Sequence, residues 1–226
     1  MNNIQKVESL WNYLFEGNDK QAWQEKFEIC WDVDQFFFDI QKRIRSIVAK
    51  SIVKVLREKL TNYELKSFGF LEGAKFGYTF IFNNDWPRTD ICAYALEFQK
   101  NHYYDLYYGI KKSNEDEYIP FKGRWDILEL NQSCKDILEK IRNAMLQTNK
   151  AWAVSDWWVL YRMFDAPYGG MWEKRFYEEI LEKSEKSIED GCTTVAEYYV
   201  QEMVELIKNT ESLVGEFVKL YASSKS

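Results

Sequence analysis

Alternating apolar and polar positions between residues 66 and 112 predict four short strands. They cover 67–72, 75–83, 91–100 and 103–110, with short turn-forming segments between them. Strands joined by such short connections pair antiparallel, because a parallel pair needs a crossover of about a dozen residues or more. A fifth apolar and aromatic run, 157–164, predicts one further strand.

Helical periodicity governs the segments on either side of these strands. Residues 34–60 form one expected helix, with a buried stripe of Ile40, Ile44, Ile47, Val48, Val55 and Leu56. Two short helices are expected within 1–33, and others over 133–147 and from 171 to 188. We place the start of the C-terminal helix at a capping box formed by Thr194 and Glu197.

An apolar seam runs along the C-terminal helix. Its members alternate steps of three and four residues, as in a coiled coil: Ala196, Tyr199, Met203, Leu206, Thr210, Leu213, Phe217 and Leu220. Such a seam packs against helices of the same chain or pairs with a second copy. We expect packing within the chain, and a homodimer through this helix is the alternative.

Together these elements predict an α+β fold. An antiparallel β-meander of about four strands, plus one further strand, packs against several helices, the last of them long. The 226 residues, 46% of them apolar, suffice for one core, so we expect a single domain over 1–226. Within it we distinguish an N-terminal helical segment (1–33), a core (34–165) and C-terminal helices (166–226). No apolar run approaches the ~20 residues that span a bilayer, so no membrane contact is expected.

The cysteines and the single histidine exclude several kinds of chemistry. The four cysteines lie far apart without a Cys-x-x-Cys pair, which excludes a zinc ribbon and a thioredoxin-like motif. With His102 as the only histidine, most catalytic zinc sites are excluded as well. The N-terminal residues lack the layout of a signal peptide, so we expect reduced thiols and a cytoplasmic location.

The net charge of −6 conceals a concentration of basic residues. Residues 37–66 carry eight bases and three acids, whereas 1–36 carry three bases and seven acids. Helical spacing places four of the bases along one edge of the helix 34–60: Arg43, Lys50, Lys54 and Arg57. This basic ladder suits an acidic protein surface or a row of phosphates, and its alternative is a solvated helix face. Because the acidic flanks repel a polyanion, we favour a protein partner, with nucleic acid as the weaker option.

A second candidate contact surface lies on the predicted strands. It consists of four tyrosines, which offer a large contact area at low entropic cost: Tyr94, Tyr104, Tyr107 and Tyr108.

Three short stretches carry a family resemblance: GYTFIFNNDW at 77–86, ALEF at 95–98 and YDLYYGI at 104–110. They resemble the C-terminal region of a group of bacterial proteins classed with the PD-(D/E)XK nuclease superfamily. In that group the nuclease motif lies upstream of this region, so the resemblance implies the accessory part without the catalytic part. It also implies a nuclease- or defence-related setting in bacteria or phage.

A nuclease of that superfamily needs an aspartate on one strand and Glu-x-Lys on the next. Both carboxylates then hold one divalent metal while the lysine activates water. The nearest candidates here are Asp90, Glu97, Gln99 and Lys100, with Asp85 as a substitute for Asp90. Asp90 and Glu97 lie seven residues apart in one predicted strand and point to opposite faces. We therefore expect no catalytic residue, metal or other cofactor. The alternative is a Mg²⁺ or Mn²⁺ site at Asp90 and Glu97.

The sequence thus favours a non-catalytic module that binds another protein through the basic ladder or the tyrosines. Two alternatives stay open. One is the metal-dependent nuclease with a degenerate motif, and the other is an acidic inhibitor that mimics nucleic acid.

Overall fold

The computed structural model describes Ser9 and residues 12–13, 20–72, 77–87, 91–99, 105–112, 130–148, 150–170 and 173–224. By its internal contacts the chain divides into two compact units, 1–43 and 44–226. The division falls after Arg43. The single domain with its three segments stays a prediction. The larger unit contains an antiparallel sheet and a long C-terminal helix, as the predicted α+β class requires.

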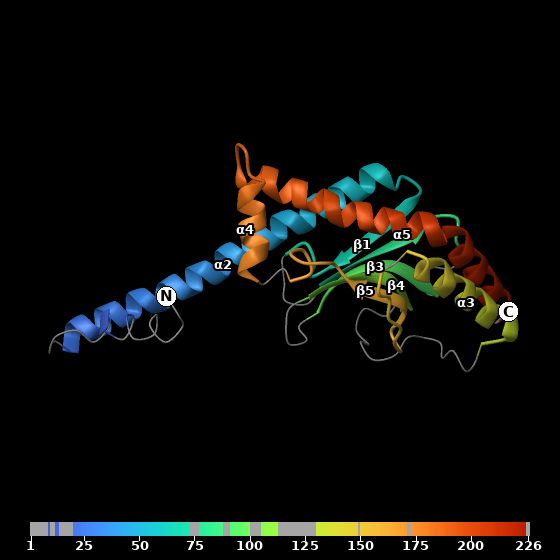
Figure 1. Cartoon of the computed structure of the whole chain (residues 1–226), viewed down its shortest axis with the longest axis horizontal. Coiled ribbons are helices and arrows are strands. Elements are labelled where there is room, and N and C mark those ends of the chain that lie inside the picture. The colour runs from blue at the N-terminus through green and yellow to red at the C-terminus, as the bar shows by residue number, and fades with distance from the viewer. Residues whose placement is uncertain are drawn as a thin grey trace. The chain divides into compact units, whose positions relative to one another are not determined.

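Five strands form one antiparallel sheet in the order β1-β2-β3-β4-β5. Figure 1 labels β1, β3, β4 and β5 of this sheet. They are β1 (Tyr63–Phe68), β2 (Gly77–Asn83), β3 (Cys92–Gln99), β4 (Asp105–Lys112) and β5 (Trp158–Met163). The meander and the fifth strand are therefore confirmed. The first strand lies earlier than the predicted 67–72, because Gly69 adopts a φ of 62° directly after it and ends the extended backbone.

The basic helix is longer than the sequence analysis predicted. Helix α2 runs without interruption from Lys20 to Lys59, which corrects the prediction of a separate helix before residue 34. No glycine or proline occurs between these bounds, so nothing in the sequence stops the helix. In the larger unit α2 buries Val48, Ile52 and Leu56 completely, whereas Ile40, predicted to be buried, is 53% exposed.

Three further helices complete the larger unit: α3 (Gln132–Leu146), α4 (Lys174–Glu182) and α5 (Ile188–Ser224). Helix α3 matches its prediction and begins at Asn131, whose side chain accepts a hydrogen bond from the backbone N–H of Cys134. Helix α4 ends six residues before the predicted end at 188, because a turn at 183–187 separates it from α5.

Helix α5 begins about two turns earlier than predicted, with its cap at Ser187 instead of Thr194. Its capping box is formed by Ser187 and Asp190: each backbone N–H donates to the other side chain, at 3.3 Å and 3.0 Å. Thr194 lies inside the helix, and its hydroxyl donates to the carbonyl of Asp190. The predicted box of Thr194 and Glu197 was therefore wrong.

The seam of α5 packs within the chain, as the preferred interpretation predicted. Its residues from Ala196 to Thr210 and Phe217 are buried, and Leu213 and Leu220 are partly buried against the same core. Helix α5 contacts α3, α4 and β4 of its own chain. The seam is therefore not free to pair with a second copy.

The two faces of the sheet differ in character. One face turns Tyr94, Leu96 and Tyr108 toward the helices, and α3 and α5 lie along this side in Figure 1. The opposite face carries Tyr78, Phe80 and Tyr107 with two polar residues, Glu97 and Lys111. Small residues, Ala95 and Gly109, stand at its centre. A side chain at Gly109 would lie 2.1 Å from the carbonyl oxygen of Leu160, so β4 and β5 require a glycine there.

No helix in the described part of the chain combines the length and apolar character that a membrane crossing needs. Cys92, Cys134 and Cys192 are buried free thiols, as predicted. Burial raises the pKa of the Cys192 thiol to about 12, which keeps it protonated and unreactive near neutral pH.

Candidate functional site

Three members of the basic ladder line one groove. Lys50, Lys54 and Arg57 stand exposed on the part of α2 that belongs to the larger unit. Together with Val53, Glu58 and Leu71 they line a cavity of about 410 Å³, which we call the basic groove. The helical spacing of four and three residues stacks the three cations over about 10 Å of helix. The structure thus brings together three of the four ladder residues.

The floor of the basic groove is apolar and held in place. Val53 is buried and Leu71 is half-buried against the core. The hydroxyl of Ser46 on α2 donates a hydrogen bond of 2.5 Å to the carbonyl oxygen of Leu71. This bond fixes the segment after β1 beside the helix, so the groove exists without a ligand.

The cations of the basic groove lack counter-ions. Lys50, Lys54 and Arg57 form no ion pair or hydrogen bond with any residue that the structure describes, and Glu58 is the only acid among the lining residues. Several other bases of the larger unit do have partners, among them Lys111 with Glu97, Lys150 with Glu202, and Lys183 with Glu179. The groove therefore concentrates uncompensated positive charge. Arg43, the fourth ladder residue, is exposed and ends the smaller unit.

The predicted tyrosine surface is largely wrong. Tyr94 and Tyr108 are completely buried because they lie on the helix-facing side of the sheet. The Tyr94 hydroxyl lies 3.0 Å from that of Thr210, and the Tyr108 hydroxyl donates to Glu202 at 2.6 Å. Tyr107 is half-buried on the opposite face. Tyr104 lies outside the described residues.

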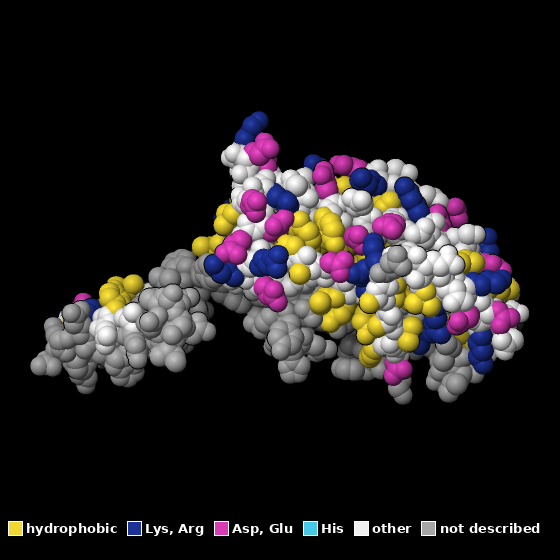
Figure 2. Space-filling view, in the orientation of Figure 1, with side chains coloured by type: hydrophobic (Ala, Val, Ile, Leu, Met, Phe, Trp, Pro, Cys, Tyr) yellow, Lys and Arg dark blue, Asp and Glu magenta, His cyan; other side chains and the backbone are white. Residues whose placement is uncertain are grey.

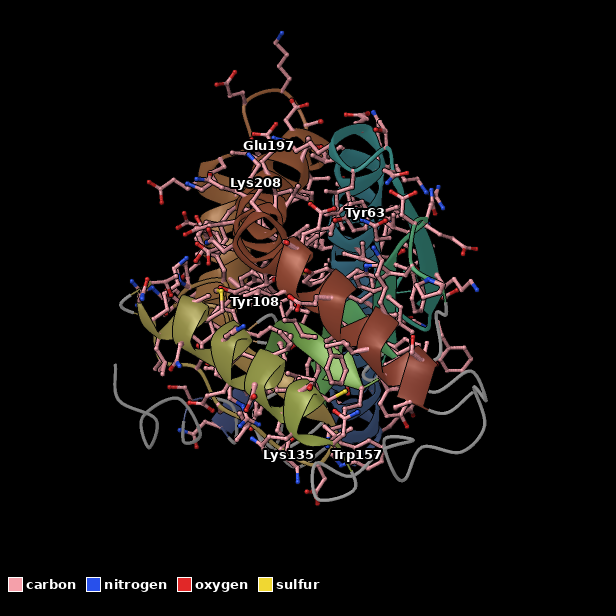
Figure 3. The ribbon with its side chains drawn as sticks, turned by 90° about the vertical axis from the view of Figure 1, so that its right-hand side faces the viewer. Tyr63, Tyr108, Lys135, Trp157, Glu197 and Lys208 are labelled. Atoms are coloured by element: carbon pink, nitrogen blue, oxygen red, sulfur yellow. The ribbon has the colours of Figure 1, made fainter. Side chains whose placement is uncertain are left out.

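Figure 3 labels Tyr108 and Tyr63, and both donate hydrogen bonds to carboxylates of α5. Burial, followed by the hydrogen bond to Glu202, raises the pKa of Tyr108 far above its ordinary value. Burial and the bond to Glu211 do the same for the pKa of Tyr63. Both phenols therefore stay protonated as donors, and their role is structural.

Glu97, the central residue of the nuclease alternative, is 3% exposed and paired with a lysine. Its carboxylate accepts a hydrogen bond from Lys111 on the neighbouring strand. The Lys111 ammonium also lies 5.2 Å from the ring centre of Trp158 and 5.7 Å from that of Tyr78. The positive charge beside Glu97 is thus a side chain of the chain itself, where a nuclease would place its metal.

Asp85 and Glu97 do not meet. Glu97 pairs across the sheet with Tyr78, near the start of β2, whereas Asp85 follows the end of that strand at Asn83. The stretch between Tyr78 and Asn83 alone spans about 16 Å, too far for one metal ion. This corrects the proposal that Asp85 substitutes for Asp90.

The roles of the other residues in the nuclease alternative stay predictions. Asp90 and Lys100 lie outside the described residues, as does the side chain of Gln99. Among the residues that are described, no group of three or more His, Cys, Asp and Glu side chains is placed to hold a metal ion.

A second cavity, of about 370 Å³, lies between the turn after β2 and helix α5. Its lining includes three carboxylates, one base and one tryptophan, and we call it the acidic pocket: Asn83, Asp85, Trp86, Glu211, Ser212, Gly215, Glu216 and Lys219. One oxygen of Glu211, Oε1, accepts hydrogen bonds from Tyr63 (2.6 Å) and Asn83 (2.7 Å). Asn62 donates to Asp85 at 2.8 Å.

Sequence reasoning found the bases of the groove but neither its floor nor the acidic pocket. Val53 and Leu71 come together only in the tertiary fold, and no local sequence pattern predicts such a contact. For the acidic pocket one signal existed: Gly215 is a glycine well inside a long predicted helix, where glycine is unfavourable.

No family model, curated protein or solved structure matches this chain.

Proposed function

We propose that this chain is a non-catalytic interaction module whose basic groove binds an acidic segment of a partner protein. The observation that carries the proposal is the convergence of three unpaired cations on an apolar floor. Lys50, Lys54 and Arg57 attract carboxylates, while Val53 and Leu71 accept an apolar side chain between them. An acidic peptide with interspersed apolar residues offers both kinds of group.

Several features favour a protein over a nucleic acid as the partner. The chain has a net charge of −6 and a pI near 5.1, so its overall field repels a long polyanion more strongly than a short acidic segment. On the face in view in Figure 2, acidic and basic side chains are interspersed, with no extended basic area. Three cations along two helical turns match a few carboxylates. Nucleic-acid sites normally engage many more phosphates.

The setting of this function is also a proposal. The resemblance to a nuclease-associated group supports a bacterial or phage system related to defence. The buried free thiols support the reducing cytoplasm.

A binding experiment with matched charge variants tests the groove. The probe is a short fluorescent peptide in which leucines separate glutamates, and its anisotropy is followed as protein is added. Lys50→Ala with Lys54→Ala should weaken binding about tenfold, because two exposed ion pairs contribute about 1–2 kcal/mol together. Alanine is at least as good a helix former, so the melting temperature should hold.

The matched control is Lys140→Ala with Lys208→Ala. Both lysines are exposed inside helices α3 and α5, and Figure 3 labels Lys208. This variant changes the net charge equally and should bind as the wild type does. Equal loss in both variants would show a general charge effect and refute the groove. Tighter, salt-sensitive binding of single-stranded DNA, lost in the Lys50/Lys54 variant, would replace the protein partner by nucleic acid.

A further inference from the structure

Gly215 lies inside helix α5, and packing does not require it. A β-carbon built at this position would have its nearest neighbours at 3.5 Å and 4.0 Å, in the Trp86 ring, which is ordinary contact distance. Gly191 on the same helix differs, because a side chain there would lie 2.2 Å from the carbonyl oxygen of Ile180. Glycine is less favourable than alanine within a helix. The absence of a side chain at 215 therefore indicates that the pocket beside Trp86 is kept open for a ligand.

That space adjoins the indole nitrogen of Trp86. Nε1 of Trp86 is the atom closest to where a side chain at 215 would stand, and both residues line the acidic pocket. Trp86 is 8% exposed, yet its N–H donates to no residue that the structure describes. The N–H is not among the fully buried side-chain atoms that lack a partner, so it is accessible from the pocket and available as a donor. A hydrogen-bond acceptor on a ligand would therefore pair with the Trp86 N–H.

The remaining groups of the pocket select the charge of that ligand. Asp85, Glu211 and Glu216 line it, against a single base, Lys219. Tyr63 and Asn83 already engage Oε1 of Glu211, whereas Glu216 accepts no hydrogen bond from a described residue. A ligand here meets negative charge beside one neutral donor.

We propose that the acidic pocket binds a lysine or arginine side chain presented by a peptide. The cationic group pairs with Asp85 and Glu216, and a peptide carbonyl accepts the hydrogen bond of the Trp86 N–H. The pocket volume of about 370 Å³ lies in the range of small-ligand sites. The pocket shares no residue with the basic groove, so this site is independent of the function proposed above.

Nuclear magnetic resonance of the full chain tests this directly. The indole N–H of Trp86, one of nine tryptophans, is assigned by its loss in Trp86→Phe. The probes are Nα-acetyl-arginine amide and Nα-acetyl-lysine amide, with Nα-acetyl-glutamine amide as the neutral comparison. We expect the cationic probes to shift the Trp86 signal in a saturable manner and the neutral probe to leave it in place.

Gly215→Ala is the decisive variant because its effects on folding and binding have opposite signs. Alanine stabilises the helix, so the melting temperature should hold or rise, while the added methyl group covers the indole N–H. Binding of the arginine probe should weaken by up to about tenfold, the effect of losing the hydrogen bond between the Trp86 N–H and the peptide carbonyl. Wild-type affinity in this variant overturns the proposal.

Charge variants provide the second arm. Asp85→Asn with Glu216→Gln should abolish the shift, whereas Asp156→Asn with Glu185→Gln, two exposed acids outside the pocket, should preserve it. An equal loss in both double variants contradicts a specific site. Equal binding of the neutral probe and the arginine probe would also contradict the proposal. So would Mg²⁺, if it shifted the Trp86 signal as arginine does.

Discussion

At the scale of single residues, the buried pair of Glu97 and Lys111 distinguishes the sheet face opposite the helices. The side chains are 4% and 12% exposed, and aromatic rings surround the ammonium. A buried ion pair adds little net stability, but removing one partner leaves the other charge uncompensated. Replacing only one member of the pair should therefore destabilise the fold, whereas replacing both should be better tolerated.

Lys111→Met should destabilise the fold by about 3–5 kcal/mol, because Glu97 stays buried and charged while losing the Lys111 ammonium that it is paired with. The double variant Lys111→Met with Glu97→Leu should recover most of that loss. Urea denaturation of the three proteins measures both effects. If the single variant lost less than about 1 kcal/mol, Glu97 would be better solvated than its burial indicates.

The residue scale also shows where sequence reasoning fails. Tyr94 and Tyr108 lie on one face of neighbouring strands, and the sequence pattern did not say which face the helices cover. Both tyrosines were predicted to be exposed because tyrosine is common at interfaces. Their hydroxyls instead bond to Thr210 and Glu202 on α5, more than ninety residues further along the chain.

At the scale of elements, local signals predicted the type of each helix and strand better than its ends. The start of α5 is the clearest case, because two capping boxes compete within one stretch of sequence. Ser187 with Asp190 prevails because Asp190 accepts from the backbone N–H groups of both Lys186 and Ser187. A helix that began at Thr194 would leave out Cys192. In the structure Cys192 is part of the helix and is buried in the core.

Ser187→Ala should cost about 1 kcal/mol of stability, since it removes an acceptor at the first turn of the helix. Thr194→Ala is the matched control: its hydroxyl bonds only within the helix, and alanine has the higher helix propensity. Thermal unfolding compares the two variants. A larger loss of stability for Thr194→Ala than for Ser187→Ala would instead support a helix that begins at Thr194.

At the scale of the whole molecule, one polar cluster joins segments that are distant in sequence. Glu202 on α5 accepts hydrogen bonds from Tyr108 on β4 and from Lys150, which follows α3. Burial by itself raises the pKa of Glu202, but the bonds from Lys150 and Tyr108 outweigh it and lower the pKa below the ordinary 4.5. The charged carboxylate is thus the form that the folded state prefers.

The sign of the resulting pH dependence follows from that shift. Because the folded pKa lies below the unfolded one, the contribution is complete above pH 4.5 and is lost as the pH falls through the folded value. Glu202→Gln should lower the melting temperature at neutral pH and narrow its difference from wild type in acid. Glu185→Gln, an exposed control, should follow the wild-type curve. A constant difference between Glu202→Gln and wild type across this range would contradict the assignment.

The order of the strands has a consequence for how the molecule assembles. Strands β1 to β4 each pair with their neighbour in the chain, but β5 joins β4 only after α3 has been traversed. Closing that longer loop costs more chain entropy than forming the hairpins. The first four strands can therefore nucleate early, with β5 sealing the edge afterwards. Until that moment the edge of β4 is an open template, and an identical β5 from another nascent molecule would fit it equally well.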